Sequence, residues 1–394
     1  MNDPRLAFMY VAEIEGLRYP EDCPFKTQRT GMVRKQLQSF GLIGGPGRDE
    51  IGFNSATIEE LSGFHTEPYL EELQRAAGGN LTIQGLHMGL GGLDTPVFPD
   101  LFRYGALACG AALRAADLLI AGDADVVFSL PGGFHHAKAA HAGGFCYLND
   151  VVLACSRLAA AGRRVAYLDI DAHHGDGVQE AFYGRSDVLT VSMHESGKTL
   201  YPWGGFETEL GEGAGLGYNV NVPLPAGIYD EAFLEAFDGV VAPILGAYGP
   251  DVVVMELGMD ALAGDPLTHL SLTNNALAAV VERIQGLDRP VLVAGGGGYH
   301  LAHTVRGWSL AWRVFAGEGE ADDFGCGLGG VMLASSEWAG GLRDPVRVVM
   351  EEDRRSVEPE LRAVMDRIRR TVFSRHGLGA ESALPGSPPG EAGP

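Results

Sequence analysis

Short apolar runs alternate along the chain with longer segments in which apolar residues recur every three to four positions. The short runs predict buried strands, and the longer segments predict helices packed on one face. The expected strands are Arg5–Val11, Asp125–Leu130, a run that begins at Val165, Asp187–His194, Gly217–Pro223, Asp251–Glu256 and Pro290–Ala294. The expected helices are Phe25–Phe40, Thr57–Arg75, Leu101–Ala121, Asp150–Ala161, Asp230–Tyr248, Asn274–Gly286, Leu301–Phe315 and, last, about Pro359–Arg375.

This alternation predicts an α/β fold, a single domain with a mostly parallel central sheet and helices on both faces. We expect the domain to cover residues 1–376 and the Gly- and Pro-rich residues 377–394 to form a disordered tail. Thr57 and Glu60 fit a helix capping box, and the Gly-rich stretch Gly85–Phe98 predicts a loop.

One stretch, Val165–Gly177, joins an expected buried strand to a dense polar ending. It reads V-A-Y-L-D-I-D-A-H-H-G-D-G, so the apolar run ends in three aspartates and two histidines. Buried strands do not end in titratable clusters unless those groups bind something, because an unpaired charge is costly to bury. Side chains two apart on an extended chain point the same way, so Asp169, Asp171 and His173 share one side. This spacing indicates a metal site.

Other expected strands also end in polar residues. In open parallel sheets, ligands bind at the edge where the strands have their carboxyl ends, so these residues are expected to meet there. They are His135 and His136 in G-G-F-H-H, Ser192 and His194 in V-S-M-H, Asp260 in E-L-G-M-D, and Tyr299 in G-G-G-G-Y.

Together these residues predict metal-assisted hydrolysis of an amide. A catalytic zinc takes three protein ligands and keeps one open position, and Asp171, His173 and Asp260 supply such a set. The ion would lower the pKa of its bound water and polarise a carbonyl oxygen. The adjacent histidines would transfer protons, oriented by the carboxylates of Asp169 and Asp176. The last group, a tyrosine at the end of the glycine run, would stabilise a developing oxyanion.

Each of these residues also has a structural alternative when it is taken alone. The histidine pair is compatible with a turn that buries one imidazole, Asp260 with a helix N-cap, and Tyr299 with a packed phenol. Several histidines are expected to be structural or remain without a role: His65, His194, His269, His300 and His303.

Composition restricts the partners and the compartment. The net charge of −22, from 29 basic and 51 acidic side chains, disfavours nucleic acid and favours cationic partners such as lysine-rich peptides or polyamines. The five cysteines form no C-x-x-C pair, which indicates reduced thiols in a cytoplasmic protein. We expect no signal peptide, no membrane span and no membrane partner. Composition does not select an oligomeric state.

The chain resembles the zinc-dependent histone deacetylases and their bacterial relatives, including the acetoin-utilisation deacetylases, within the arginase/deacetylase superfamily. The resemblance covers most of Arg5–Phe315, with the family's motifs in the family's order. They are G-G-F-H-H-A-K from Gly132, G-F-C-Y-L-N-D from Gly144, L-D-I-D-A-H-H-G-D-G-V from Leu168, V-S-M-H from Val191, E-L-G-M-D from Glu256, A-G-D-P from Ala263 and G-G-G-G-Y from Gly295.

The resemblance implies a role for each matching residue and one Zn²⁺ per chain. Asp171, His173 and Asp260 match the zinc ligands. The catalytic set is His135, His136 (the general base and acid), Asp169, Asp176 and Tyr299. The substrate-binding set is rim residue Asp94 and the tunnel-wall residues Gly144, Phe145, Tyr201 and Leu267. A potassium ion is also implied, held by Asp169, Asp171, His173, Ser192 and Met193.

The resulting hypothesis is a zinc hydrolase that removes acetyl groups from N-ε-acetyl-lysine of proteins or peptides. Two departures from the family pattern, the segment Gly85–Phe98 and a tyrosine at Tyr201 where many relatives have Phe, bear on substrate choice. One alternative is an acetylpolyamine amidohydrolase, which the acidic surface also suits. An arginase-like ureohydrolase ranks lower, because that class needs paired aspartates for two metals. A catalytically inactive acyl-lysine reader is disfavoured by Tyr299 and the two histidine–aspartate pairs, and the sequence does not choose between zinc and ferrous iron.

Overall fold

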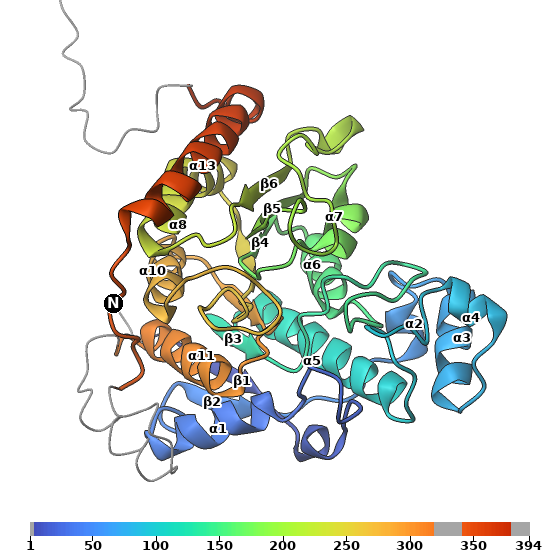
Figure 1. Cartoon of the computed structure of the whole chain (residues 1–394). Coiled ribbons are helices and arrows are strands. Elements are labelled where there is room, and N and C mark those ends of the chain that lie inside the picture. The colour runs from blue at the N-terminus through green and yellow to red at the C-terminus, as the bar shows by residue number, and fades with distance from the viewer. Residues whose placement is uncertain (1–3, 319–340, 380–394) are drawn as a thin grey trace, which may run out of the picture.

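The computed structural model describes residues 4–318 and 341–379, and within them an eight-stranded, all-parallel sheet forms the centre of the fold (Figure 1). The strand order is β2-β1-β3-β8-β7-β4-β5-β6. The strands are β1 (Leu6–Met9), β2 (Arg48–Ile51), β3 (Val126–Ser129), β4 (Val165–Asp169), β5 (Val188–Glu195), β6 (Asn219–Leu224), β7 (Val252–Glu256) and β8 (Val291–Ala294).

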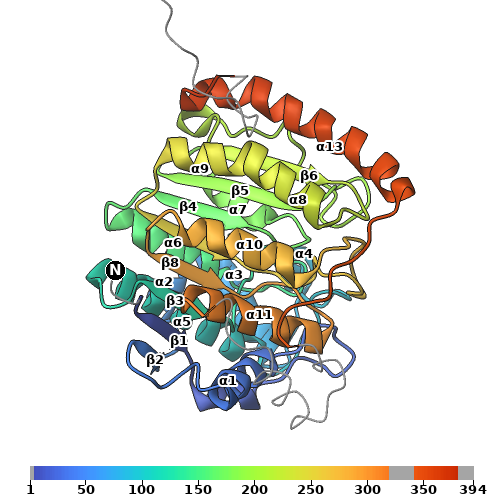
Figure 2. The ribbon, with the colours of Figure 1, turned by 90° about the vertical axis from the view of Figure 1, so that its left-hand side faces the viewer.

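Helices cover both faces of the sheet, which confirms the predicted architecture. One face carries α1 (Arg29–Ser39), α8 (Asp230–Ala236), α9 (Ala242–Tyr248), α10 (Asn274–Gln285), α11 (Leu301–Phe315) and α13 (Glu351–Thr371). The other carries α3 (Glu67–Ala77), α5 (Leu101–Ala121), α6 (Asp150–Ala160) and α7 (Asp176–Phe182). Figure 2 shows the first layer, α8 to α11, in front of the strands and α6 and α7 behind them.

Two apolar cores result, because successive strand side chains alternate between the faces. In β1, Leu6 and Phe8 belong to one core, and Ala7 and Met9 belong to the other. Helices cover both cores, so both faces of the central strands are buried. These strands are therefore continuous apolar runs, as expected for a parallel sheet. By length and composition α5 could cross a membrane, contrary to our expectation that no segment would qualify. However, 78% of the most apolar 18-residue stretch of this helix is buried inside the fold, as in the core helix of a globular protein.

Several element boundaries differ from the sequence prediction. The edge strand β2 was not among the expected strands. The expected helix Thr57–Arg75 is two helices, α2 (Ile58–Leu61) and α3, although the capping box of Thr57 and Glu60 is present. A short helix, α4 (Ile83–His87), runs into the expected loop 85–98.

The remaining differences lie in the C-terminal half. A π-helical turn, η3 (Phe237–Val241), joins α8 to α9, and α13 begins at Glu351 and continues through Pro359. The expected disordered tail lies outside the described residues from position 380 onward. The part of the chain that the structure describes also contains three short 3-10 helices: η1 (Ala12–Gly16), η2 (Gly213–Gly215) and η5 (Phe373–His376).

The register of the sheet places the ends of the central strands at one level. Asp169, the last residue of β4, pairs with Ser192 on β5 and with Glu256 on β7, and Glu256 pairs with Ala294 on β8. The segments that leave these strands therefore start side by side. They carry the residues that the sequence analysis expected to meet.

Candidate active site

Three buried side chains form a group that can hold a metal ion. Asp171 and His173 follow β4, Asp260 follows β7, and one ligand atom from each lies within 4.8 Å of the others. His173 Nδ1 is 2.8 Å from Asp260 Oδ2 and 3.2 Å from Asp171 Oδ1. The structure thus brings together the three residues that the sequence suggested as ligands.

Backbone groups fix the two carboxylates. Asp171 Oδ2 accepts a hydrogen bond from Gly297 N at 2.6 Å, and Asp260 Oδ1 accepts one from Ala172 N at 2.9 Å. A Cβ atom at Gly297 would overlap the Asp260 carboxylate, and one at Gly258 would overlap that of Asp171. Glycine is therefore required where the chain passes the ligands closely. Asp260 does not cap a helix, so that alternative is wrong.

The protonation behaviour of the group fits a divalent cation. Burial and the charge of Asp171 raise the pKa of Asp260 to about 7. Burial opposes the charged form of His173, but hydrogen bonds to Asp171 and Asp260 outweigh it and raise the pKa of His173 to about 10. A proton is therefore held between two carboxylates and one imidazole nitrogen. Two carboxylates and one imidazole are suitable zinc ligands, and a zinc ion would replace this proton.

Beside this group lie two histidine–aspartate pairs. His135 Nδ1 is 3.0 Å from Asp169 Oδ2, and His136 Nδ1 is 2.8 Å from Asp176 Oδ1. The two Nε2 atoms are 3.1 Å apart. Both histidines are buried, and both have the partners that the sequence analysis expected, so a simple turn with one buried imidazole is ruled out.

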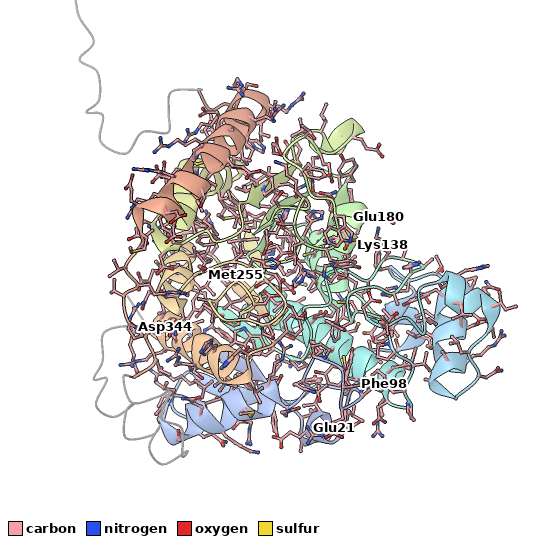
Figure 3. The ribbon with its side chains drawn as sticks, viewed as in Figure 1. Glu21, Phe98, Lys138, Glu180, Met255 and Asp344 are labelled. Atoms are coloured by element: carbon pink, nitrogen blue, oxygen red, sulfur yellow. The ribbon has the colours of Figure 1, made fainter. Side chains whose placement is uncertain are left out.

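The two pairs have different second partners. Asp169 also accepts hydrogen bonds from the Tyr167 hydroxyl (2.6 Å) and from the backbone N–H of Asp171 (3.0 Å). Asp176 lies closer to solvent, and its Oδ2 is 3.3 Å from Lys138 Nζ. This lysine also contacts Glu180 at 3.2 Å, and Figure 3 shows the two side chains next to each other.

The two imidazoles also differ in proton affinity. Burial alone would lower the pKa of His135, but the carboxylates of Asp169 and Asp171 outweigh it and raise the pKa well above 6.5. Burial and the positive charge of His135 lower the pKa of His136 to about 4. At neutral pH the first imidazole is therefore protonated, and the second is neutral and able to accept a proton.

Tyr299, which follows β8, lies near His173. A narrow cavity is lined by Tyr299, His136, Asp171 and Phe145. The ring centroid of Tyr299 is 6.4 Å from that of His173 and 5.8 Å from that of Phe145. Burial raises the pKa of Tyr299 well above 10, so its hydroxyl keeps its proton and can donate it in a hydrogen bond.

Two residues to which the sequence analysis gave no role hold Tyr299 in place. Asp265 Oδ2 accepts a hydrogen bond from Tyr299 N at 2.8 Å. The buried guanidinium of Arg29 donates to Gly298 O at 3.1 Å and to Gly296 O at 3.0 Å. Arg29 comes from α1 and is far from the motifs in sequence, so no local pattern pointed to it.

Of the residues proposed for the substrate tunnel, Gly144 and Phe145 line this cavity, and Asp94 and Tyr201 line a larger cavity beside it. Asp94 Oδ2 accepts a hydrogen bond from Gly144 N at 2.9 Å, and Phe145 N donates to Asp94 O at 2.9 Å. Phe145 has a φ of 66°, an unusual value for an aromatic residue and one that occurs at functional sites. The Tyr201 ring lies edge-on to His136 at 5.0 Å between centroids. Leu267 N donates to Asp265 Oδ1 at 3.0 Å, which places Leu267 beside the Tyr299 loop.

Ser192 and Met193 are buried on β5, next to Asp169. The Ser192 hydroxyl is 2.8 Å from His194 Nδ1, and His194 Nε2 is 2.8 Å from Gly205 O. His194, which had no role in the sequence analysis, thus fixes the orientation of a residue that was expected to bind potassium.

Glu256 is a further carboxyl group; the sequence analysis named it as the start of E-L-G-M-D but gave it no role. It is fully buried, and within the described residues neither of its oxygens has a hydrogen-bond partner. Burial and the charge of Asp169 raise its pKa well above 4.5, against the opposing charge of His135. It forms a second group with His135 and Asp171 within 4.8 Å, but both nitrogens of His135 already pair with Asp169 and His136. The signal for Glu256 was its position at the end of β7, which matches that of Asp169 at the end of β4.

The remaining histidines lie outside the metal group. His65 is buried and its Nε2 accepts a hydrogen bond from Asn149 N at 2.9 Å. His269 Nδ1 is 2.8 Å from Glu195 Oε1, and the His300 side chain caps α11 by accepting from His303 N.

Comparisons with known proteins identify the family of this chain. Residues 23–315 match the model of the histone deacetylase domain. Histone deacetylase 8 of Xenopus tropicalis is 38% identical over 292 residues, which cover 74% of this chain and 78% of that protein. The Danio rerio protein of the same name is 37% identical over 322 residues (80% and 84%), and histone deacetylase RPD3 of Saccharomyces cerevisiae is 37% identical over 307 residues (77% and 70%).

Solved structures agree as well. The crystal structure of a histone deacetylase homolog in complex with SAHA has a TM-score of 0.82 at 30% identity, covering 93% of this chain and all of that chain. A homolog from Aquifex aeolicus has a TM-score of 0.79 at 31% identity, covering 92% of this chain and all of that chain. The chain therefore belongs to the zinc-dependent histone deacetylase family and is an amide hydrolase of the deacetylase type.

Proposed function

We propose that this protein removes acetyl groups from N-ε-acetyl-lysine in proteins or peptides, with a single zinc ion held by Asp171, His173 and Asp260. The observation that carries the proposal is the convergence of three types of group on one buried point. Asp171 of the metal-ligand set, the neutral imidazole of His136 and the protonated phenol of Tyr299 all line the cavity in which an acetyl group would lie.

Zinc, when bound, would lower the pKa of a water molecule and polarise the acetyl carbonyl. His136 is suited to take the proton from that water, because it is neutral and Asp176 fixes its Nδ1–H. The same imidazole would then deliver the proton to the departing lysine amine. Tyr299 would donate a hydrogen bond to the acetyl oxygen as negative charge develops there.

The proposal extends to the substrate and to a second ion. Asp94 at the tunnel mouth would hold the substrate backbone, and Gly144, Phe145, Tyr201 and Leu267 would surround the acyl-lysine chain. A potassium ion would lie between the side chains of Asp169 and Ser192 and the backbone carbonyls of Asp171, His173 and Met193. A cytoplasmic location is supported by the free, buried thiols of the described cysteines: Cys23, Cys109, Cys146 and Cys155.

Metal removal tests the proposal. The purified protein should release acetate from an acetyl-lysine peptide, lose this activity after chelation, and regain it with one equivalent of zinc per chain. Acetate release and metal content would be measured on the same samples. Activity that survives complete chelation, or that requires two metals per chain, would contradict the single-zinc site. No release from any acetyl-lysine peptide would contradict the substrate class.

A further inference from the structure

A cavity of about 660 Å³ adjoins the active site and extends well beyond the catalytic residues. We call it the side cavity. It begins at His136, Asp176 and Tyr201 and extends to the segment between α4 and α5. Asp94 also lines it, so a substrate backbone bound at Asp94 would pass along its edge. The lining also includes Leu86, Leu90, Ala142 and Pro202.

Exposed apolar side chains gather on the two segments that border this cavity. The described residues include eleven exposed large hydrophobic side chains, and five of them lie on these segments: Leu81, Ile83, Leu86, Leu93 and Trp203. Leu86 lines the cavity itself, and the other four are close in sequence to lining residues. All five except Trp203 belong to α4 and the residues around it, at the side of the molecule where Figure 1 shows α3 and α4. Such a gathering on a soluble surface indicates a site that binds an apolar group.

Two of these side chains are especially informative. Leu93 is fully exposed, and its neighbours Gly92 and Asp94 both line the cavity. Trp203 follows the lining residue Pro202 and is 64% exposed at a φ of 64°. A bulky residue in the left-handed region is strained, and this strain is not offset by burial of the indole. Binding of a ligand would bury the indole and offset the strain.

The charges of the side cavity do not suit a polycation. Asp176 is already paired with His136 and with Lys138, and Asp94 accepts a hydrogen bond from Gly144 N. Lys138 itself lines the cavity and would repel ammonium groups. The net charge of −22 favours cations near the protein as a whole, but this cavity has few free carboxylates for a polyamine.

We propose that the side cavity binds a large apolar side chain adjacent to the acetyl-lysine, which makes the enzyme selective for acetylated peptides with such a residue and not for acetylated polyamines. This inference rests on the proposed function and specifies its substrate class. The occupant is a side chain of the substrate, because the cavity continues directly from the place where the acetyl-lysine enters.

The test compares three acetyl-lysine peptides that differ only in the residue next to the lysine, which is Phe, Gly or Asp, together with monoacetylspermidine. The double variant Leu93→Ser/Trp203→Ser removes apolar surface from the rim. The matched control is Val346→Ser/Val348→Ser, which removes two exposed valines far from the cavity, on the segment leading into α13. kcat/KM would be measured for each enzyme with each substrate. Sedimentation velocity would give the oligomeric state of each protein.

We expect the wild-type enzyme to favour the Phe peptide over the Gly peptide by about tenfold or more, since a buried Phe ring is worth at least that factor. The rim variant should bring this ratio close to one, and the valine control should keep it.

Equal rates on the three peptides, faster cleavage of monoacetylspermidine, or an unchanged ratio in the rim variant would overturn the inference while the deacetylase function stands. Conversion of a dimer to a monomer by the rim variant would also overturn it, by showing that a second copy covers the rim. Cleavage of none of the peptides would refute the proposed function, and the inference with it.

Discussion

His135 and His136 are neighbours in the chain, and each pairs through Nδ1 with an aspartate, but the two pairs lie in different surroundings. The pair of His135 and Asp169 is enclosed by further carboxyl groups, those of Asp171 and Glu256. The pair of His136 and Asp176 faces the cavity, and its aspartate is shared with Lys138. Negative charge surrounds the first imidazole, and positive charge adjoins the second.

The difference shows that environment, more than the immediate partner, decides what a histidine can do. His135 keeps a proton, because several carboxylates stabilise the imidazolium. That proton in turn disfavours a second positive charge 3.1 Å away, which contributes to the low pKa of His136. The inner pair thus keeps the outer imidazole neutral. Four predictions test whether His135 stays protonated and His136 stays neutral.

The largest effect is expected from removal of the outer imidazole. His136→Ala should lower kcat on an acetyl-lysine peptide by about 10²- to 10⁴-fold, the usual contribution of a general acid–base group. Zinc content should remain near one per chain, because this residue is not part of the ligand set. The matched control, His376→Ala, removes a histidine in η5, where its ring contacts Gly217 O, and should keep full activity. A near-normal kcat for His136→Ala would show that another group transfers the proton.

The next largest effect should follow from Asp176→Asn, which removes the charge but keeps the shape of the partner. The amide no longer fixes the Nδ1–H tautomer, so Nε2 is less often free to accept a proton, and kcat should fall by about 10- to 100-fold. Glu180→Gln is the control, because Glu180 shares Lys138 with Asp176 but does not contact His136. Steady-state kinetics at saturating peptide would measure both variants. Equal losses in the two would attribute the effect to Lys138 instead of to the tautomer of His136.

The convergence of the site residues at one edge of the sheet could be predicted from the sequence, because it follows from one rule. Parallel strands end at the same edge of a sheet, so Asp171, His173, Asp260 and Tyr299 could be placed together from the endings of β4, β7 and β8 alone. The edge strand β2 was missed because its sequence, R-D-E-I, is polar and half exposed, unlike that of the buried strands. The break between α2 and α3 was missed because the apolar pattern continues across it.

What the sequence could not give were contacts whose meaning depends on the surroundings. The residues around Lys138 in the sequence do not indicate that it contacts both Asp176 and Glu180. Arg29 contacts the Tyr299 loop from a helix almost 270 residues earlier in the chain. Glu256 reads as an ordinary end to an apolar run. Its importance lies in the absence of hydrogen-bond partners in the described structure, which no linear pattern encodes.

A smaller effect is expected from pH. With a pKa of about 4 in the free enzyme, His136 is fully neutral at pH 6, so the group should not limit kcat/KM between pH 6 and pH 8. As pH falls through about 4, the imidazole gains a proton and kcat/KM should decline. The folded pKa lies below the ordinary 6.5, so the unfolded chain binds this proton more readily, and stability should also fall as pH drops from 6.5 to 4. An acidic limb centred near pH 6.5 in a kcat/KM profile would mean that His136 lacks the influence of a protonated His135.

The smallest effect on activity, and the sharpest test of the inner pair, should come from Glu256→Gln. If Glu256 already carries a proton at neutral pH, as its raised pKa implies, glutamine leaves the charge around His135 unchanged and kcat should stay within about twofold.

The stability of the folded protein should respond more strongly to this substitution than its activity. In the unfolded chain the glutamate ionises near pH 4.5, whereas in the folded chain it stays protonated, so rising pH destabilises the wild type by up to about 1.4 kcal/mol per pH unit until the folded pKa is passed. Glutamine has no such penalty, so the free energy of unfolding of the variant should exceed that of the wild type by more at pH 8 than at pH 5, measured by urea denaturation of the chelated proteins. A tenfold loss of kcat together with a less stable variant at pH 8 would mean that Glu256 is ionised, and that its charge helps to hold the proton on His135.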